Sequence, residues 1–269
     1  MKILGVDFTS APRRRKCIAA ATGLLAERNL SIEKIERLES FAAFEGLLAR
    51  PGPWIGGFDF PFGLPREAVE ALGWSTDWRE LARSCARLGK AEFKRRLDRY
   101  RESRPPGRRY ATRRGDAASG AHPAVKLVNP PVGLMFFEGA PRLAAAGLTV
   151  PCLADGDPSR VALEAYPGLL VRRQLGIRDS YKNDQRSQQT AARRAVRVQI
   201  LRAMQAGKPH GIRVKLADSL QQQLIDDGTG DSLDAVICAV QASWGQNHGA
   251  PRYGLPAEVD PVEGWIVSA

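Results

Sequence analysis

The chain has 269 residues, of which 43% are hydrophobic and 26% are charged, a composition typical of one large or two small globular domains. Its formal net charge of +11 favours a polyanionic partner, either nucleic acid or an anionic membrane surface. No apolar run approaches the roughly 20 residues that cross a bilayer, and Asp7 interrupts the apolar N-terminus where a signal peptide would continue. We therefore expect no membrane-spanning segment and a cytoplasmic location.

The first sixty residues predict a strand, a hairpin, a helix and a further strand. A short apolar run at residues 2–8 ends in turn residues, and strands are expected at 17–21 and 30–38. Ser40 has the residue type of an N-cap and precedes a helical pattern with its apolar residues on one face. Residues 54–60 have the pattern of a buried strand.

From residue 66 the strand signals give way to helical patterns, and the α/β pattern resumes only after about residue 125. Within this stretch, residues 79–114 contain 14 Lys and Arg against 4 Asp and Glu, almost the whole excess positive charge of the protein. The sequence Arg104-Pro105-Pro106-Gly107 interrupts the helical pattern. We predict that residues 66–125 form a basic helical insertion in an α/β domain, without an independent core.

The α/β pattern continues toward the C-terminus. A strand is expected at residues 161–166, and a long basic helix from about 188 to 206. A helix over residues 231–244 has apolar residues at the spacing of a core-facing stripe, and 265–267 is expected to be a closing strand. Residues 1–269 are therefore predicted to form one α/β domain that contains the insertion.

Acidic residues stand in apolar surroundings at four places in the chain. Asp7, Asp59 and Glu164 each follow apolar residues of an expected strand, and Asp231 and Asp234 begin an apolar helix. A carboxylate at a buried strand end is costly unless it is paired or binds a metal, and open α/β sheets place their sites at the carboxyl ends of strands. Residues three apart project from nearly the same helix face. We expect these carboxylates to share one site.

A cluster of carboxylates is suited to divalent cations. Neighbouring carboxylates raise one another's pKa unless cations compensate, and oxygen-only clusters suit Mg²⁺ or Mn²⁺. Two such ions activate a water and stabilise the leaving oxygen in phosphodiester cleavage. The four cysteines and three histidines are widely scattered, which argues against zinc. The predicted cofactor is a pair of Mg²⁺ or Mn²⁺ ions held by the five carboxylates.

Each acid also has a structural interpretation. Asp7 precedes turn residues, and Asp59 precedes a proline and is able to bond loop backbone. Glu164 is able to pair with an arginine of the basic helix. Asp231 with Asp234 also fits a helix N-cap followed by an acid at the N3 position. Acids on separate elements, beside a basic segment, together favour a site over these separate interpretations.

Four motifs carry a family resemblance. They are VDFTSAP at residues 6–12, FDFPFGLP at 58–65, LEAYP at 163–167 and GDSLDAVICAVQA at 230–242. As a set they resemble the predicted RNase H-like nucleases of an uncharacterised family (domain of unknown function 429), over nearly the whole chain. The resemblance implies a mixed five-stranded RNase H-like sheet flanked by helices, with metal-dependent nuclease activity.

A wider similarity is to the Holliday-junction resolvases of the RNase H superfamily. They have an Asp on the first strand, an acid on a later strand and a D-x-x-D-A pattern on the last helix. Asp7 matches the first of these, and Asp231 with Asp234 matches the last. The middle acid stays open between two residues. Asp59 has the matching position but is Asp where the resolvases have Glu, whereas Glu164 has the matching residue type on a later strand.

The basic insertion is expected to follow a phosphate backbone, with Trp78, Tyr100 and Tyr110 stacking on bases. The alternative is a solvated helix face. Lys182 follows the strand of Glu164 and is either a phosphate contact near the metal ions or a surface lysine. The residues predicted to contact phosphate or nucleic acid are Lys182, Arg95, Arg96, Arg108, Arg109, Arg113 and Arg114.

These observations predict a nuclease that hydrolyses phosphodiester bonds by a two-metal-ion mechanism, with an activated water as nucleophile. One alternative is a nucleic-acid-binding RNase H-like module without catalysis. Another is an actin-like or sugar-kinase-like phosphotransferase, which shares the opening of strand, Asp and hairpin. Against it, the chain lacks a second phosphate loop of the DxGTT type.

Overall fold

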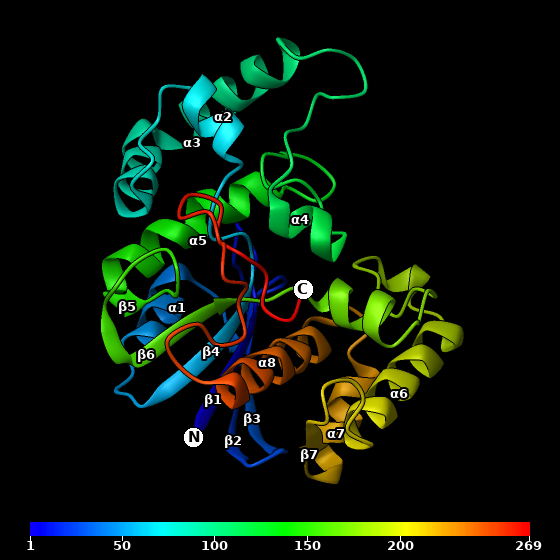
Figure 1. Ribbon diagram of the computed structural model, residues 1–269. Coiled ribbons are helices and arrows are strands. Elements are labelled where there is room, and N and C mark those ends of the chain that lie inside the picture. The colour runs from blue at the N-terminus through cyan, green and yellow to red at the C-terminus, as the bar shows by residue number, and fades with distance from the viewer.

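A mixed seven-stranded sheet with helices on both faces forms the centre of the protein (Figure 1), as seen in a computed structural model that describes residues 1–269. The strands are β1 (Lys2–Asp7), β2 (Ile18–Ala26), β3 (Asn29–Leu38), β4 (Trp54–Asp59), β5 (Leu148–Thr149), β6 (Asp157–Glu164) and β7 (Arg213–Lys215). The helices are α1 (Phe41–Leu48), α2 (Arg66–Ala71), α3 (Trp78–Glu102), α4 (Arg114–Ser119), α5 (Val132–Ala146), α6 (Ala191–Gln205), α7 (Asp218–Asp226) and α8 (Asp231–His248). A π-helical turn at Leu169–Gln174 and a 3₁₀ turn at Arg186–Gln188 complete the regular elements.

The strand order is β5-β6-β4-β1-β2-β3-β7. β1, β2 and β3 form an antiparallel meander, while β4 is parallel to β1, and β6 is parallel to β4. The predicted α/β class is confirmed, but the predicted count of five strands is too low. β5 and β7 add a strand at each edge with only two and three residues, which is too short for a detectable apolar period.

Most of the longer elements lie where the sequence predicts them. Ser40 caps α1, because its Oγ accepts a hydrogen bond from the backbone N–H of Ala43 at 3.1 Å. The helix predicted at 188–206 is α6, and the helix predicted at 231–244 is α8, which extends to His248. The closing strand predicted at 265–267 is wrong, since only Ile266 forms an isolated bridge to Glu164.

Helix α8 lies against β1 and β4 at unusually close range (Figure 1). Two glycines permit this approach. A Cβ atom built at Gly5 would come within 2.0 Å of the carbonyl oxygen of Ala235, and one at Gly57 within 2.3 Å of that of Cys238. Because side chains alternate along a strand, Asp7 and Asp59 lie on the same sheet face as these glycines. The N-terminus of α8 is thereby brought toward both carboxylates.

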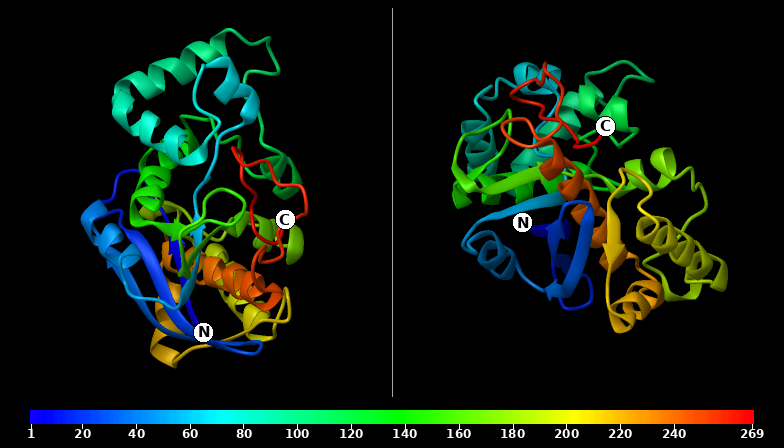
Figure 2. Two further views of the ribbon diagram at one scale, coloured as in Figure 1. Left: turned by 60° about the vertical axis from the view of Figure 1, so that its left-hand side comes forward. Right: turned by 60° about the horizontal axis from the view of Figure 1, so that its bottom comes forward.

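The opposite face of the sheet is covered by α1 and α5, and α3 packs on α5. Helices α2 to α4 belong to the predicted insertion and form a lobe at one end of the sheet (Figure 2). Trp78 and Phe93 of this lobe share one apolar cluster with Phe58 and Phe62. The lobe therefore shares the core of that face. None of the helices is long and apolar enough to cross a membrane.

Candidate cation site at the carboxyl ends of the parallel strands

Two carboxylates stand side by side where β1 and β4 end. Asp7 is the register partner of Asp59 in the parallel pairing of these strands, so both side chains point to the face covered by α8. Asp7 is 9% exposed. Neither carboxylate accepts a hydrogen bond or forms an ion pair within the chain; each interacts with its charged neighbours only through space. Asp59 is half-buried, and a pair of adjacent acids without a partner at such a place is an uncompensated cost to the fold.

Helix α8 contributes two further carboxylates. Asp231 is its first residue, and Asp234, one turn later, is completely buried. The helix is not capped by Asp231, as the structural interpretation supposed, because the cap position is Gly230. Asp227 instead accepts a hydrogen bond from the backbone N–H of Ser232 at 2.9 Å. Neither Asp231 nor Asp234 therefore caps the helix.

Two lysines and a tyrosine are bound to the acids of α8. Lys182 forms an ion pair with Oδ2 of Asp234, and the hydroxyl of Tyr181 donates to Oδ1 of the same carboxylate at 2.5 Å. Lys16 donates to Oδ1 of Asp231 at 3.2 Å and to Oδ1 of Asp184 at 2.9 Å. Lys182 was expected to contact phosphate; in the structure its ammonium neutralises part of the acidic cluster.

The pKa values reflect this crowding of charge. Burial raises the pKa of Asp7 well above its usual range, and Asp234, Asp231 and Asp59 reinforce the rise, which Lys182 opposes. Burial and Asp234 raise the pKa of Asp59 to about 7. Burial also raises the pKa of Asp231, although Lys16 opposes the rise. Near neutral pH the site therefore holds protons unless a cation takes their place.

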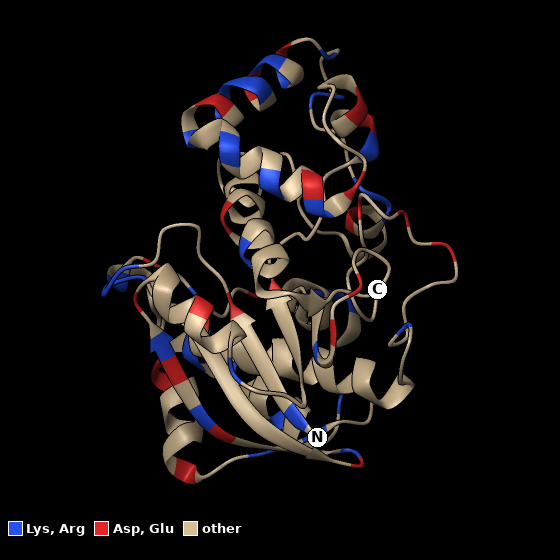
Figure 3. Cartoon of the chain, turned by 90° about the vertical axis from the view of Figure 1, so that its left-hand side faces the viewer, with Lys and Arg blue, Asp and Glu red and all other residues tan.

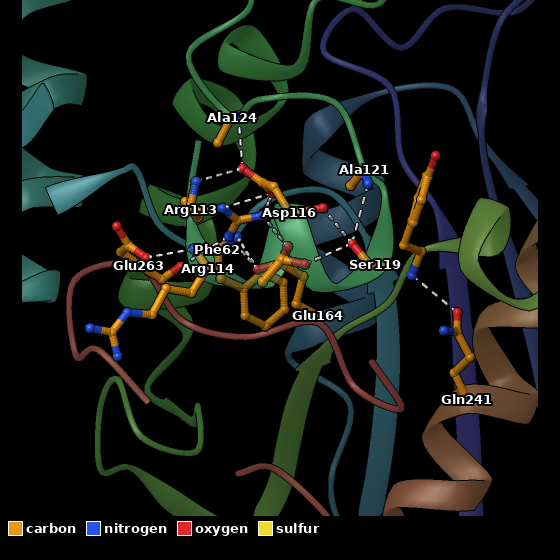
Figure 4. Close-up of polar contacts among 12 residues, drawn as sticks. Phe62, Arg113, Arg114, Asp116, Ser119, Ala121, Ala124, Glu164, Gln241 and Glu263 are labelled. Carbon is orange, nitrogen blue, oxygen red and sulfur yellow. Dashed lines mark hydrogen bonds and ion pairs between the residues drawn. The ribbon is translucent and has the colours of Figure 1, made fainter. Parts of the chain in front are cut away.

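Glu164 points to the other face of the sheet. Its register partner on β4 is Phe58, not Asp59, so alternation turns it away from Asp7. Arg113 donates from Nη1 and Nη2 to the two carboxylate oxygens at 2.8 and 2.6 Å, and the backbone N–H of Phe62 donates at 2.9 Å (Figure 4). Burial raises the pKa of Glu164, and Arg113 opposes the rise.

The same arginine joins Glu164 to the insertion and the C-terminal segment. Arg113 is 2% exposed and also forms an ion pair with Asp116 at 2.6 Å. The carboxylate of Glu263 accepts hydrogen bonds from the backbone N–H groups of Arg66 and Arg114, each at 2.9 Å. These two residues stand at the start of α2 and of α4, so Glu263 holds the base of the insertion (Figure 4).

A cavity of about 400 Å³ opens above both groups of acids. Its lining includes Asp7, Asp59 and Asp231, together with Lys16 and Lys182. Glu164 and Arg113 also line it. The volume is that of a small-ligand site. The remaining lining residues that bear on its chemistry are Phe8, Phe60, Val132, Met135, Tyr166 and Arg172.

The other predicted phosphate contacts lie on the insertion, where Lys and Arg gather along the helices (Figure 3). Arg95 and Arg96 both pair with Glu92 within α3. Arg108, Arg109 and Arg114 are exposed, whereas Arg113 is buried in its ion pairs. The predicted stacking residues Trp78 and Tyr100 are 1% and 7% exposed. For these two residues the expectation is wrong, because both side chains pack in the core; Tyr110, the third predicted residue, is half-buried.

Sequence reasoning missed several residues of the site, and only some of them have a sequence signal. Lys16 lies in the hairpin after β1, and Tyr181 lies in a loop, each bound to an acid far away in the sequence. Asp116 in Arg113-Arg114-Gly115-Asp116 would have been found by asking how so many arginines are neutralised. Asp227 belongs to Asp226-Asp227-Gly228-Thr229, whose composition is typical of a helix start.

The donor set fits Mg²⁺ or Mn²⁺ in kind, since Asp7, Asp59, Asp231 and Asp234 offer only oxygen atoms. In their present arrangement no three acids converge as ligands of one ion. Both carboxylates of α8 are instead bound to lysine ammonium groups. Both oxygens of Asp234 are thus occupied, by Tyr181 and Lys182, whereas Oδ2 of Asp231 has no partner in the chain.

The fold and the site define the class: an α/β protein with a buried carboxylate cluster where its parallel strands end. More narrowly, the chain belongs to the family described as a protein of unknown function (DUF429), whose model matches residues 5–258. The membership predicted from the four motifs is thus confirmed. No curated protein and no solved structure matches the chain.

Proposed function

We propose that this protein is a metal-dependent nuclease of the RNase H-like class. Its substrate would be the phosphodiester backbone of a nucleic acid. The observation that carries the proposal is the pair formed by Asp7 and Asp59, two adjacent carboxylates without a partner in the chain that line the cavity. Such a pair is stabilised by a cation more than by any other ligand.

The arrangement of the sheet supports this assignment. An antiparallel meander of β1, β2 and β3 is followed by β4 and β6, which add in parallel on the other side of β1. An acid ends the first strand, and a late helix brings two more acids to it, as the resemblance to RNase H-like nucleases implies. The short strands β5 and β7 leave this central order unchanged.

The position of Asp59 favours it over Glu164 as the middle ligand. Asp59 shares a sheet face with Asp7, whereas Glu164 is held by Arg113 on the other face. Asp7, Asp59 and Asp234 would hold the first ion, and Asp231 would contribute to the second. The ions would supply the activation of a water and the stabilisation of the leaving oxygen. Glu164 would then support the fold.

The positive charge supports an anionic polymer as substrate. Arg108 and Arg109 project from an exposed loop of the insertion without an ion pair, and Arg172 lines the cavity itself. Phosphate contacts of this kind fix a nucleic acid in place without reading its sequence.

The test is a calorimetric Mn²⁺ titration of the wild type and of Asp7→Asn, combined with cleavage assays on labelled DNA and RNA. We expect the wild type to bind Mn²⁺ and to cut at least one substrate. Asp7→Asn should lose metal affinity and cleavage together, because the substitution removes a charge but keeps the shape of the side chain. Asp155→Asn, at an exposed acid away from the cavity, serves as the matched control. Cleavage that survives Asp7→Asn contradicts the proposal.

A binding module without catalysis is the second candidate, and one observation favours it. Lys16 and Lys182 already neutralise the acids of α8, so this part of the cluster is stable without metal. Salt-dependent binding of nucleic acid, without metal binding or cleavage in the same assays, would establish this alternative.

A further inference from the structure

Lys182 occupies a place that a cation would take. Its ammonium forms an ion pair with Asp234, which is completely buried, and lies close enough to Asp7 to lower the pKa of that acid. Asp7 itself is nine-tenths buried, lines the cavity and has no bonded partner. The ammonium thus acts electrostatically on two carboxylates, Asp234 and Asp7, but is bonded only to Asp234.

The loop that carries Lys182 is anchored by buried hydrogen bonds, whereas the lysine side chain is held at its ammonium end and is partly exposed. Arg197 is 3% exposed and donates from Nη1 to the carbonyl oxygen of Tyr181 at 2.7 Å. The hydroxyl of Tyr181 holds Oδ1 of Asp234. The side chain of Lys182, by contrast, is 41% exposed and lines the cavity. It is able to leave Asp234 without moving the backbone or the carboxylate.

We propose that Lys182 is a built-in counter-ion of the acidic site, which gives up Oδ2 of Asp234 when a divalent cation enters. The proposal rests on the proposed function, because it concerns the same metal site. Tyr181 is the positioning residue that keeps Asp234 oriented during the exchange. A divalent cation is favoured over one ammonium because it also satisfies Asp7 and Asp59. The released ammonium remains in the wall of the cavity, where it meets an anionic substrate.

Lys182 and the metal should therefore compete. The experiment is a calorimetric Mn²⁺ titration of the metal-stripped full chain at one pH, with wild type, Lys182→Met, Lys182→Arg and Lys215→Met. Lys215 is an exposed lysine on β7 without an acidic partner and is the matched control. We expect Lys182→Met to bind Mn²⁺ about tenfold more tightly than the wild type, since a neighbouring charge shifts a carboxylate's cation affinity by at least that factor. Lys182→Arg and Lys215→Met should show no gain.

Thermal unfolding is a second measurement. If Lys182 were only a surface lysine, its replacement would leave the melting temperature unchanged. In chelator, Lys182→Met should melt below the wild type because Asp234 loses its counter-ion, and Mn²⁺ should raise its melting temperature more than that of the wild type. In the wild type, reductive ¹³C-methylation of the lysines should give a Lys182 signal, absent from Lys182→Arg, that shifts on addition of Mg²⁺. This measurement does not depend on the folding of Lys182→Met.

The outcomes separate the two proposals. Unchanged or weaker Mn²⁺ affinity in Lys182→Met, or a Lys182 signal that stays in place while Mg²⁺ binds, overturns the counter-ion role and leaves the nuclease proposal standing. Absence of Mn²⁺ binding in both the wild type and Lys182→Met overturns the metal site itself, and with it this inference.

Discussion

Two groups of acids lie at the same edge of the sheet, on its opposite faces, and they differ in whether their charge is paired within the chain. On one face, Glu164 and Asp116 share the buried guanidinium of Arg113, at 2.6 Å from each. On the other face, Asp7 and Asp59 stand together without any partner in the chain. Both groups line one cavity, and Asp7 is buried as Glu164 and Asp116 are, so exposure alone does not explain the difference.

The two groups differ in whether a cation of the chain offsets the acidic charge. Breaking a satisfied, buried ion pair leaves a naked charge in the interior, and the fold is destabilised. Neutralising an unsatisfied acid removes a repulsion, and the fold is stabilised. We therefore expect substitutions in the two groups to change the free energy of unfolding in opposite directions.

The largest effect is expected from Arg113→Met. This substitution leaves Glu164 and Asp116 buried without their cation, so the free energy of unfolding should fall by about 3 to 5 kcal/mol. Chemical denaturation at pH 7 is the measurement. Arg108→Met, at an exposed arginine of the same insertion, should change the stability by no more than about 0.5 kcal/mol. Equal effects of the two substitutions would refute the structural role of the buried cluster.

A smaller effect of opposite sign is expected from Asp59→Asn. The pKa of Asp59 is raised from its ordinary value of 3.8 to about 7, so the folded state holds a proton that the unfolded chain releases. The stability due to this proton is complete below about pH 4 and is lost as the pH rises to about 7. At pH 8 without divalent ions, Asp59→Asn should therefore be more stable than the wild type by roughly 1 to 3 kcal/mol.

Thermal unfolding of wild type and Asp59→Asn at pH 5 and pH 8 measures this difference. At pH 5 only the first part of this loss has occurred, so Asp59→Asn should melt slightly above the wild type, and the gap should widen by pH 8. Each kcal/mol at pH 8 corresponds to about 2 to 4 °C for a chain of this size. If Asp59→Asn is destabilised equally at both pH values, the carboxylate has a partner after all.

The smallest effect on stability is expected outside both acidic groups. The double variant Arg108→Gln with Arg109→Gln should unfold within about 0.5 kcal/mol of the wild type, because neither side chain has an ion pair. Its nucleic-acid affinity should depend less steeply on salt, with the logarithmic slope reduced by about 2. Fluorescence anisotropy at several salt concentrations measures the slope. A matched pair on β7, Arg213→Gln with Lys215→Gln, should leave the slope unchanged.

Sequence patterns predicted the four acids on the α8 face because each stands out against apolar neighbours. Asp7 and Asp59 end strands that are largely buried, and Asp231 with Asp234 begins a largely buried helix. The structure brings these residues to one edge of the sheet. Their meeting at one edge follows without knowledge of register, since parallel strands that end together place their last residues together. That Asp7 and Asp59 share a face depends on the register of β1 with β4.

The sheet face to which Glu164 points could not be predicted from the sequence. A shift of one residue in the pairing of β6 with β4 reverses which side chains face α8, and that register is set by the packing of the whole sheet. The partner of Glu164 was equally hidden, because Arg113 comes from a different segment than the basic helix. The aromatic residues among the arginines of α3 were misread because helical spacing also places Trp78 and Tyr100 on its core-facing side.

The close seating of α8 against Gly5 and Gly57 has a consequence for how the chain folds. The residues of β1 are synthesised well before α8, since the helix that completes the acidic site begins more than 220 residues after that strand. Such non-local contacts form late, because a long loop must close before they contribute stability. During translation, a reaction that needs both the acids of the strands and those of α8 therefore cannot occur until α8 has left the ribosome and packed against the sheet.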